Sequence, residues 1–195
     1  MSRRVAIITD ANMHLGPDLA RILASRQHDL VLGEPAPGLA EELIARGAQV
    51  ETVYGVADLS ASSSIAKLME AAVARFERID AACVRTGKIV VGDFMDATID
   101  DFQTLVSHNV EAVFHVLKAL LPHMEQAGSG QVVIVTSATG VRAQPQAALY
   151  STTRAAANML VKNAALSVAK SGVTVNAIGT NYLDYPGFRN ASGAD

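Results

Sequence analysis

The sequence predicts an α/β protein built on a doubly wound parallel sheet. Six short apolar runs rich in β-branched residues alternate with segments whose apolar residues recur at the helical period. Continuous apolar runs are typical of strands buried on both faces, and right-handed crossovers through helices make such strands parallel. We therefore expect one Rossmann-like domain over residues 1–195, apparently lacking the C-terminal end of that fold.

The expected elements follow one another in strict alternation. The tail from Asp184 onward is rich in turn-forming residues and is expected to be a loop. Each predicted strand is a short apolar run: residues 4–9, 29–33, 49–54, 79–84, 131–136 and 173–178. Each predicted helix has the helical period: residues 16–26, 38–46, 61–78, 99–126 and 147–171.

Composition limits the classes of protein to consider. A chain of 195 residues that is 50% hydrophobic can bury one good core and is short for two domains. The net charge is −3 and the basic residues are scattered, so neither nucleic acid nor an anionic membrane surface is an expected partner. No apolar run approaches the roughly 20 residues of a membrane-spanning helix. The single cysteine, Cys83, excludes an internal disulfide and is consistent with the cytoplasm.

A serine, a tyrosine and an arginine form a candidate acid/base site. Tyr150 and Arg154 are four residues apart in a predicted helix, so their side chains share one face. Ser137 ends the apolar run 132–137 and so lies at the carboxyl end of a strand, where such sheets bind ligands. A cation beside a phenol favours the phenolate. We therefore expect Ser137 to donate a hydrogen bond to a substrate oxygen and Tyr150 to transfer the proton.

The first strand–helix turn is poor in glycine. A dinucleotide-binding turn requires several glycines, so that the pyrophosphate can approach the backbone and the helix N-terminus. Here only Gly16 is present, while Asp10 and His14 occupy positions where glycine is expected. Glu34, after the second predicted strand, could hold a ribose hydroxyl, although a polar loop residue is the simpler interpretation. The turn disfavours a bound dinucleotide without excluding one.

Over its whole length the chain resembles the short-chain dehydrogenase/reductases. That resemblance implies the Rossmann-like fold and a serine–tyrosine–base order of catalytic residues. It is carried by residues at matching family positions: Asp58, Leu59, Asn109, Ser137, Tyr150 and a base at position 154.

The departures from that family resemble one of its offshoots, the halohydrin dehalogenases. Dehydrogenases of the family have lysine where this chain has Arg154. They also have an Asn-Asn-Ala-Gly-like segment and a Pro-Gly where this chain has Val-Arg-Thr-Gly at 84–87 and Thr-Asn-Tyr-Leu at 180–183. In the dehalogenases the triad is Ser-Tyr-Arg and a halide pocket replaces the nicotinamide site. Thr9 and Gly16 fit the first turn of that group, where His14 stands in for an aromatic residue.

The dehalogenase resemblance implies a cofactor-independent lyase that interconverts vicinal haloalcohols with epoxides plus halide and opens epoxides with small anions. Backbone N–H groups of the loop 180–183 would stabilise the halide, as an oxyanion hole stabilises developing charge. The expected halide pocket comprises His14, Thr180, Asn181, Tyr182 and Leu183, and the expected substrate pocket comprises Thr139, Gly140 and Phe188. No cofactor is expected, so Thr9, Gly16, Asp58 and Asn109 are interpreted as vestiges of a nucleotide site.

Two other functions stay open. The first is an atypical short-chain oxidoreductase that still binds NAD(P) and tolerates Arg154, and the second is a non-catalytic ligand-binding or scaffold relative. The three histidines of the long helix, His108, His115 and His123, lack the i, i+4 spacing of a helical metal pair, so we expect surface or interface positions and no metal. Helix faces rich in alanine and valine favour a homo-oligomer, and the resemblance implies a tetramer of the full-length protein.

Overall fold

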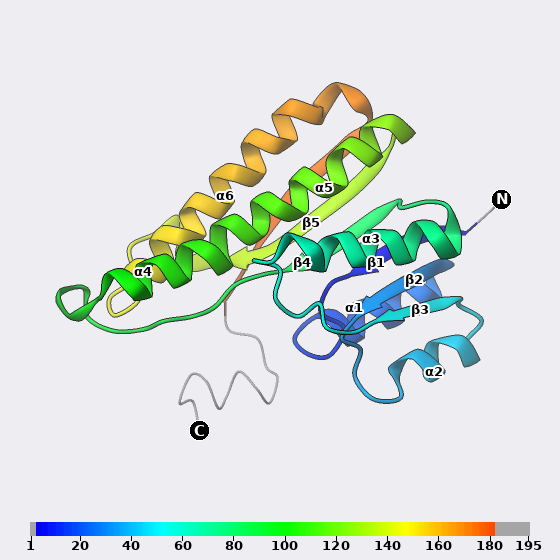
Figure 1. The fold of residues 1–195 in the computed structure, drawn as a ribbon, viewed down its shortest axis with the longest axis horizontal. Helices are drawn as coiled ribbons and strands as arrows, with labels where there is room; N and C mark the ends of the chain where they lie inside the picture. Colours follow the sequence, from blue (N-terminus) through cyan, green and yellow to red (C-terminus); the bar gives the residue numbers. More distant parts are fainter. Residues whose placement is uncertain (1–2, 182–195) are drawn as a thin grey trace.

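The computed structural model describes residues 3–181. In this part of the chain six strands form one sheet in the order β3-β2-β1-β4-β5-β6, and every neighbouring pair is parallel (Figure 1). The predicted single-domain, doubly wound α/β fold is therefore confirmed. The strands are β1 (Arg4–Ile8), β2 (His28–Gly33), β3 (Val50–Val53), β4 (Ala81–Arg85), β5 (Gly130–Ser137) and β6 (Val173–Thr180).

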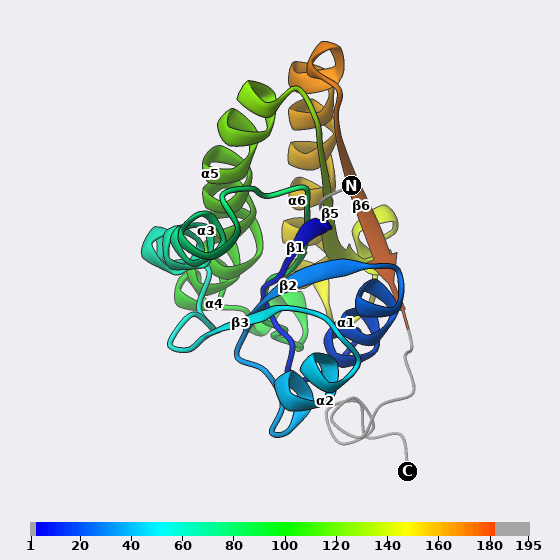
Figure 2. The ribbon, with the colours of Figure 1, turned by 90° about the vertical axis from the view of Figure 1, so that its right-hand side faces the viewer.

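The helices cover both faces of the sheet. Figure 2 shows α1 and α2 on one side, whereas α3, α5 and α6 pack together on the other. Among residues 3–181, each helix is too short or too polar to cross a lipid bilayer. The α-helices are α1 (Gly16–Ser25), α2 (Leu39–Ala45), α3 (Ser62–Phe76), α4 (Ile99–Val106), α5 (Ala112–Ala127) and α6 (Ala148–Val168).

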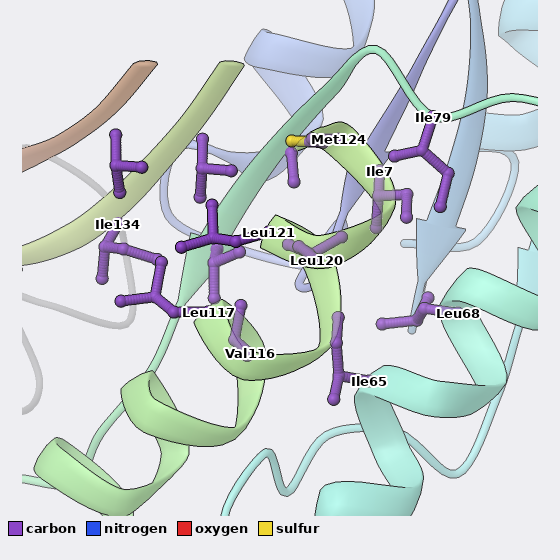
Figure 3. Packing of buried hydrophobic residues seen from close by; sticks show 14 of the residues in the cluster. Ile7, Ile65, Leu68, Ile79, Val116, Leu117, Leu120, Leu121, Met124 and Ile134 are labelled. Carbon is purple, nitrogen blue, oxygen red and sulfur yellow. The ribbon is translucent and has the colours of Figure 1, made fainter. Parts of the chain in front are cut away.

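The core has two layers because side chains alternate across each strand. In β1, Val5 and Ile7 join the larger apolar cluster under α3, α5 and α6, whereas Ala6 and Ile8 join the smaller cluster under α1 and α2. Figure 3 shows Ile7 in the larger cluster together with Leu68 of α3 and Leu120 of α5. Both faces of the central strands are thus buried, which is why these strands read as continuous apolar runs.

The long helix predicted over residues 99–126 is wrong in one respect. A π-helical turn, Ser107–Glu111, separates α4 from α5. Asn109 lies in this turn and is fully buried; its amide accepts a hydrogen bond from the Lys88 N–H (2.9 Å) and donates to the Lys88 carbonyl (3.2 Å) and to the Thr153 hydroxyl (2.9 Å). Such turns often mark functional sites. Periodicity alone cannot detect one, since apolar residues continue on both sides of it.

The buried carboxylate of Asp80 stabilises the amino end of the sheet. Asp80 accepts hydrogen bonds from the Val5 N–H (2.7 Å) and from Nη2 of Arg78 (2.6 Å). Burial acts to raise the pKa of Asp80, but the hydrogen bonds from Arg78 and Val5 outweigh it and hold that pKa below its usual value. A carboxylate with a lowered folded-state pKa stabilises the fold above its unfolded pKa, near 3.9, and loses that contribution as the pH falls through the folded value.

We expect Asp80→Asn to lower the free energy of unfolding at pH 7 by about 1–3 kcal/mol, since the charge-assisted bonds to Arg78 and Val5 are lost. The difference from the unsubstituted protein is expected to shrink below about pH 4, where Asp80 of the unfolded chain becomes protonated, and to vanish as the pH falls through the lowered pKa of Asp80 in the folded protein. Urea unfolding at a series of pH values measures both effects. A difference that stays constant down to pH 2 would contradict a stabilising role for the Asp80 charge.

Candidate active site

The carboxyl edge of the sheet contains a topological switch point between β1 and β4, where the strand order reverses. Chains leaving neighbouring strands in opposite directions open a crevice there, and open α/β sheets bind ligands in it. Thr9 and Asp10 follow β1, and Arg85 closes β4 with Thr86 and Gly87 after it. The two segments are joined because the Arg85 N–H donates to the Thr9 hydroxyl oxygen (3.1 Å).

The larger of the two main clefts that the described residues form at this edge has a volume of about 490 Å³ and is lined by Thr9, Asp10, Glu34, Asp58 and His108, among others. Glu34 accepts a hydrogen bond from the Val56 N–H (2.7 Å), so its carboxylate is oriented at the end of β2. The hydroxyl of Ser60, followed by its N–H, lowers the pKa of Asp58. His108 is half-buried and lines this cleft, with its Nε2 3.8 Å from the Asp58 carboxylate.

The smaller cleft, about 270 Å³, brings together Ser137, Tyr150 and Arg154. His14, Thr139, Thr180 and Asn181 also line it. The loop expected at 180–183 begins later than predicted, because Thr180 is the last residue of β6, pairs with Ser137 and donates its hydroxyl to the Thr136 carbonyl (3.2 Å). Tyr182, Leu183 and Phe188, expected in the halide and substrate pockets, lie outside the described residues.

Gly140 is a packing position. A Cβ there would lie 2.7 Å from the Asn158 amide nitrogen and 2.8 Å from the backbone of Arg154, so only glycine lets this loop approach α6 so closely. The expectation that Gly140 lines a substrate pocket does not match this placement, since it is absent from the lining of the smaller cleft. Its contribution is to bring the loop that follows Ser137 against the helix that carries Tyr150.

Ser137 is held by its own loop. Its hydroxyl oxygen accepts hydrogen bonds from the Thr139 hydroxyl (2.9 Å) and from the Thr139 N–H (3.2 Å). A serine hydroxyl has one hydrogen and two acceptor lone pairs. Because Thr139 uses both lone pairs, the remaining hydrogen of Ser137 is available to a substrate oxygen in the cleft.

Arg154 is a buried cation that faces the smaller cleft. Its side chain is packed away from solvent, with the guanidinium carbon 5.2 Å from the centre of the Tyr150 ring and Nη2 donating to the Thr86 carbonyl (2.7 Å). Its Nε and Nη1 are buried and have no hydrogen-bond partner among the described residues. Buried donors are nearly always satisfied in folded proteins, so these two atoms point to an oxygen-bearing ligand.

In the turn between β1 and α1, side chains occupy positions where a dinucleotide-binding turn has glycine. His14 has φ 62°, the left-handed conformation that glycine adopts most easily, and burial followed by the nearby Arg85 cation lowers its pKa. Asp10 forms an ion pair with Arg85, with Oδ2 and Nη1 2.6 Å apart. Arg85 also lines both clefts, so the pair stands where they meet.

Known proteins are similar in sequence to this chain over nearly its whole length. The sequence profile of the family described as short chain dehydrogenase matches residues 4–194. The oxidoreductase UcpA of Escherichia coli K12 is 34% identical over 190 residues, which span 95% of this chain and 72% of that protein. A cis-4-hydroxycyclohexanecarboxylate dehydrogenase of Sinomonas cyclohexanicum is 30% identical, over 95% of this chain and 75% of that protein.

Solved structures give the same result. Levodione reductase superposes with a TM-score of 0.86 at 28% identity, covering 96% of this chain and 75% of the other. NAD+-bound xylitol dehydrogenase superposes with a TM-score of 0.86 at 26% identity, covering 97% of this chain and 74% of the other. These similar proteins are oxidoreductases by name, and one of them holds a nicotinamide dinucleotide.

Two expectations from the sequence are therefore wrong. The similar proteins are oxidoreductases, which overturns the expectation of a halohydrin dehalogenase, and the NAD+-bound xylitol dehydrogenase among the structural neighbours overturns the expectation of no cofactor. The physical reason lies at the switch point. The sequence shows Asp10 as an unopposed negative charge, whereas Arg85 neutralises it in the folded chain. Thr9 and Asp58, interpreted as vestiges, line the larger cleft.

Arg85, Thr86 and Lys88, which line the larger cleft, were not predicted as site residues. The available signal was their position immediately after the fourth predicted strand, at the edge where such sheets bind ligands. Their residue types gave no such signal, because the dinucleotide-binding pattern is defined by glycines in the first turn.

Proposed function

Because the chain belongs to the short-chain dehydrogenase family, we propose that it is an NAD(P)-dependent oxidoreductase that interconverts a small alcohol and its carbonyl product. One observation carries the proposal. The cleft lined by Ser137, Tyr150 and Arg154 shares Arg85, Thr86 and Gly87 with the larger cleft at the switch point. A nucleotide in the larger cleft would thus reach the proton-transfer residues of the smaller one.

The residues present fit such a cofactor. Glu34 at the end of β2 can accept hydrogen bonds from a ribose, and Asp58 with Ser60 lies beside it in the larger cleft. The two unsatisfied donors of Arg154 fit ribose hydroxyls at the other end. Gly16 keeps the first turn tight, since a Cβ there would overlap the Asp10 carbonyl. The carboxylate of Glu34 favours NAD(H), because a 2′-phosphate beside it would be repelled.

When bound, the nicotinamide supplies or accepts the hydride. The chain itself holds the substrate and moves the proton. Ser137 donates its hydroxyl hydrogen to the substrate oxygen, because Thr139 occupies its acceptor sites. Tyr150 takes the alcohol proton in oxidation and returns it in reduction. The positive charge of Arg154, 5.2 Å from the ring, stabilises the negative charge that forms on the phenol oxygen.

Titration with NADH and NADPH, followed by cofactor fluorescence, tests the proposal. We expect saturable binding, tighter for NADH, and oxidation of at least one member of a panel of small secondary alcohols with NAD+. Glu34→Gln is expected to reduce the preference for NADH over NADPH, whereas Glu41→Gln, an exposed substitution in α2, is expected to leave it unchanged. The proposed function would be refuted if neither NADH nor NADPH binds.

A further inference from the structure

We propose that Arg85 is the phosphate-binding residue of this site and that its guanidinium replaces the glycine backbone of an ordinary nucleotide-binding turn. The inference rests on the proposed function, since it assumes that a dinucleotide spans the two clefts. It assigns the chemical class of the bound group as a diphosphate, located between Glu34 and Asp58 at one end and Tyr150 at the other.

The position of Arg85 is the first argument. It is the last residue of β4 and its side chain crosses the switch point to Asp10, which follows β1. Arg85 lines both clefts, so a ligand extending from one to the other must pass it. Its backbone is fixed by the hydrogen bond to the Thr9 hydroxyl, and its side chain is 36% exposed. The guanidinium is therefore held in the crevice and still accessible to a ligand.

The chemistry of the guanidinium is the second argument. Arginine has five N–H donors in a planar fork that matches phosphate oxygens. The ion pair with Asp10 uses Nη1. The fork can thus keep its contact with the carboxylate and also bind a phosphate through its other nitrogens.

The charges around the crevice are the third argument. In the first turn, the His14 side chain lies where a glycine would leave the backbone open to a phosphate. Pro17 also removes one backbone N–H from the start of α1. Asp10, Glu34 and Asp58 make the larger cleft acidic, opposed by the permanent cations Arg85 and Lys88. Of these cations Arg85 is the one that faces Asp10 across the switch point, so it lies where the negative charge of a diphosphate would fall.

Asp10 then acts as an opposing group. It orients Arg85, but its negative charge repels a phosphate bound to the same guanidinium. Its other oxygen accepts a hydrogen bond from the Asn12 N–H (3.2 Å), a bond that asparagine at position 10 can also accept. Asp10→Asn is therefore expected to preserve the turn while it strengthens phosphate binding.

Calorimetric titration of ADP and of adenosine separates phosphate recognition from recognition of the nucleoside. We expect Arg85→Gln to weaken ADP binding by about tenfold to a hundredfold, the range for a hydrogen bond to a charged group, and to change adenosine binding by less than about twofold. Asp10→Asn is expected to tighten ADP binding by about threefold to tenfold, and Arg85→Lys to have an intermediate effect. Arg26→Gln, exposed at the opposite end of α1, is the matched control.

The outcomes are distinct. Equal ADP affinity in the unsubstituted protein and in Arg85→Gln would overturn the role of Arg85 and leave the proposed function intact, provided that NADH still binds. Failure of ADP, adenosine and NADH to bind the unsubstituted protein would overturn both. If Arg85→Gln also loses adenosine binding, the ion pair between Arg85 and Asp10 only supports the fold, and the proposal is wrong. Unchanged ADP affinity in Arg85→Lys would confirm that result, because the proposal expects this variant to bind ADP with intermediate affinity.

Discussion

Replacement of Tyr150 by phenylalanine is expected to lower kcat by about 10²–10⁴-fold, the contribution of a positioned general acid–base group. Only the phenol oxygen is removed. The ring packs against Leu105 and Ala147 in a small buried cluster, and phenylalanine preserves that packing. NADH affinity is therefore expected to change by less than about twofold, because the residues assigned to the nucleotide are untouched.

Initial rates with the best alcohol of the panel, measured at saturating NAD+, give this result directly. Tyr54→Phe is the matched control, since Tyr54 is exposed beyond β3 and away from the smaller cleft. Catalysis by the Tyr150→Phe protein within about threefold of the unsubstituted one would show that another group transfers the proton, and the joint role of Ser137 and Tyr150 in proton transfer would have to be discarded.

The fold could be predicted because its signals are local. Six buried parallel strands read as apolar runs, and the helices between them follow the 3.6-residue period. The errors occurred where distant residues decide the structure. The π-helical turn is fixed by bonds from Asn109 to Lys88 and Thr153, 21 and 44 residues away in sequence. Thr180 continues β6 because Ser137 of β5 pairs with it.

The site was predicted in part for the same reason. The sequence identifies Ser137 as the end of a strand, and Tyr150 and Arg154 as neighbours on one helix face. The structure places all three in one cleft. The charge balance of the first turn cannot be predicted from the local sequence, because the residue that neutralises Asp10 lies 75 positions later. In the sequence alone, the missing glycines indicate a missing cofactor. The ion pair between Asp10 and Arg85 shows that a different arrangement of side chains occupies the same crevice.

Gly87 packs closely against Asn109 and Arg154, and Gly87→Ala is expected to have the largest effect on the free energy of unfolding. The residue has φ +107°, which side chains rarely adopt, and a Cβ there would overlap both the Asn109 amide oxygen and Nη2 of Arg154. Neither neighbour can yield cheaply: Asn109 is fully buried with three hydrogen bonds, and Nη2 of Arg154 is bound to the Thr86 carbonyl. Backbone strain and overpacking each cost about 1–3 kcal/mol, so we expect a loss of about 2–5 kcal/mol.

Two other glycines separate these causes. Gly55 has φ +72° with open space around its Cβ position, so Gly55→Ala introduces strain alone. Gly92 has open space and an ordinary φ, so Gly92→Ala introduces neither strain nor overlap. Urea unfolding is expected to order the losses as Gly87→Ala, then Gly55→Ala, then Gly92→Ala. If Gly87→Ala costs no more than Gly55→Ala, then Arg154 and Asn109 can move away from the crevice, and the rigid placement of Arg154 beside Tyr150 would have to be abandoned.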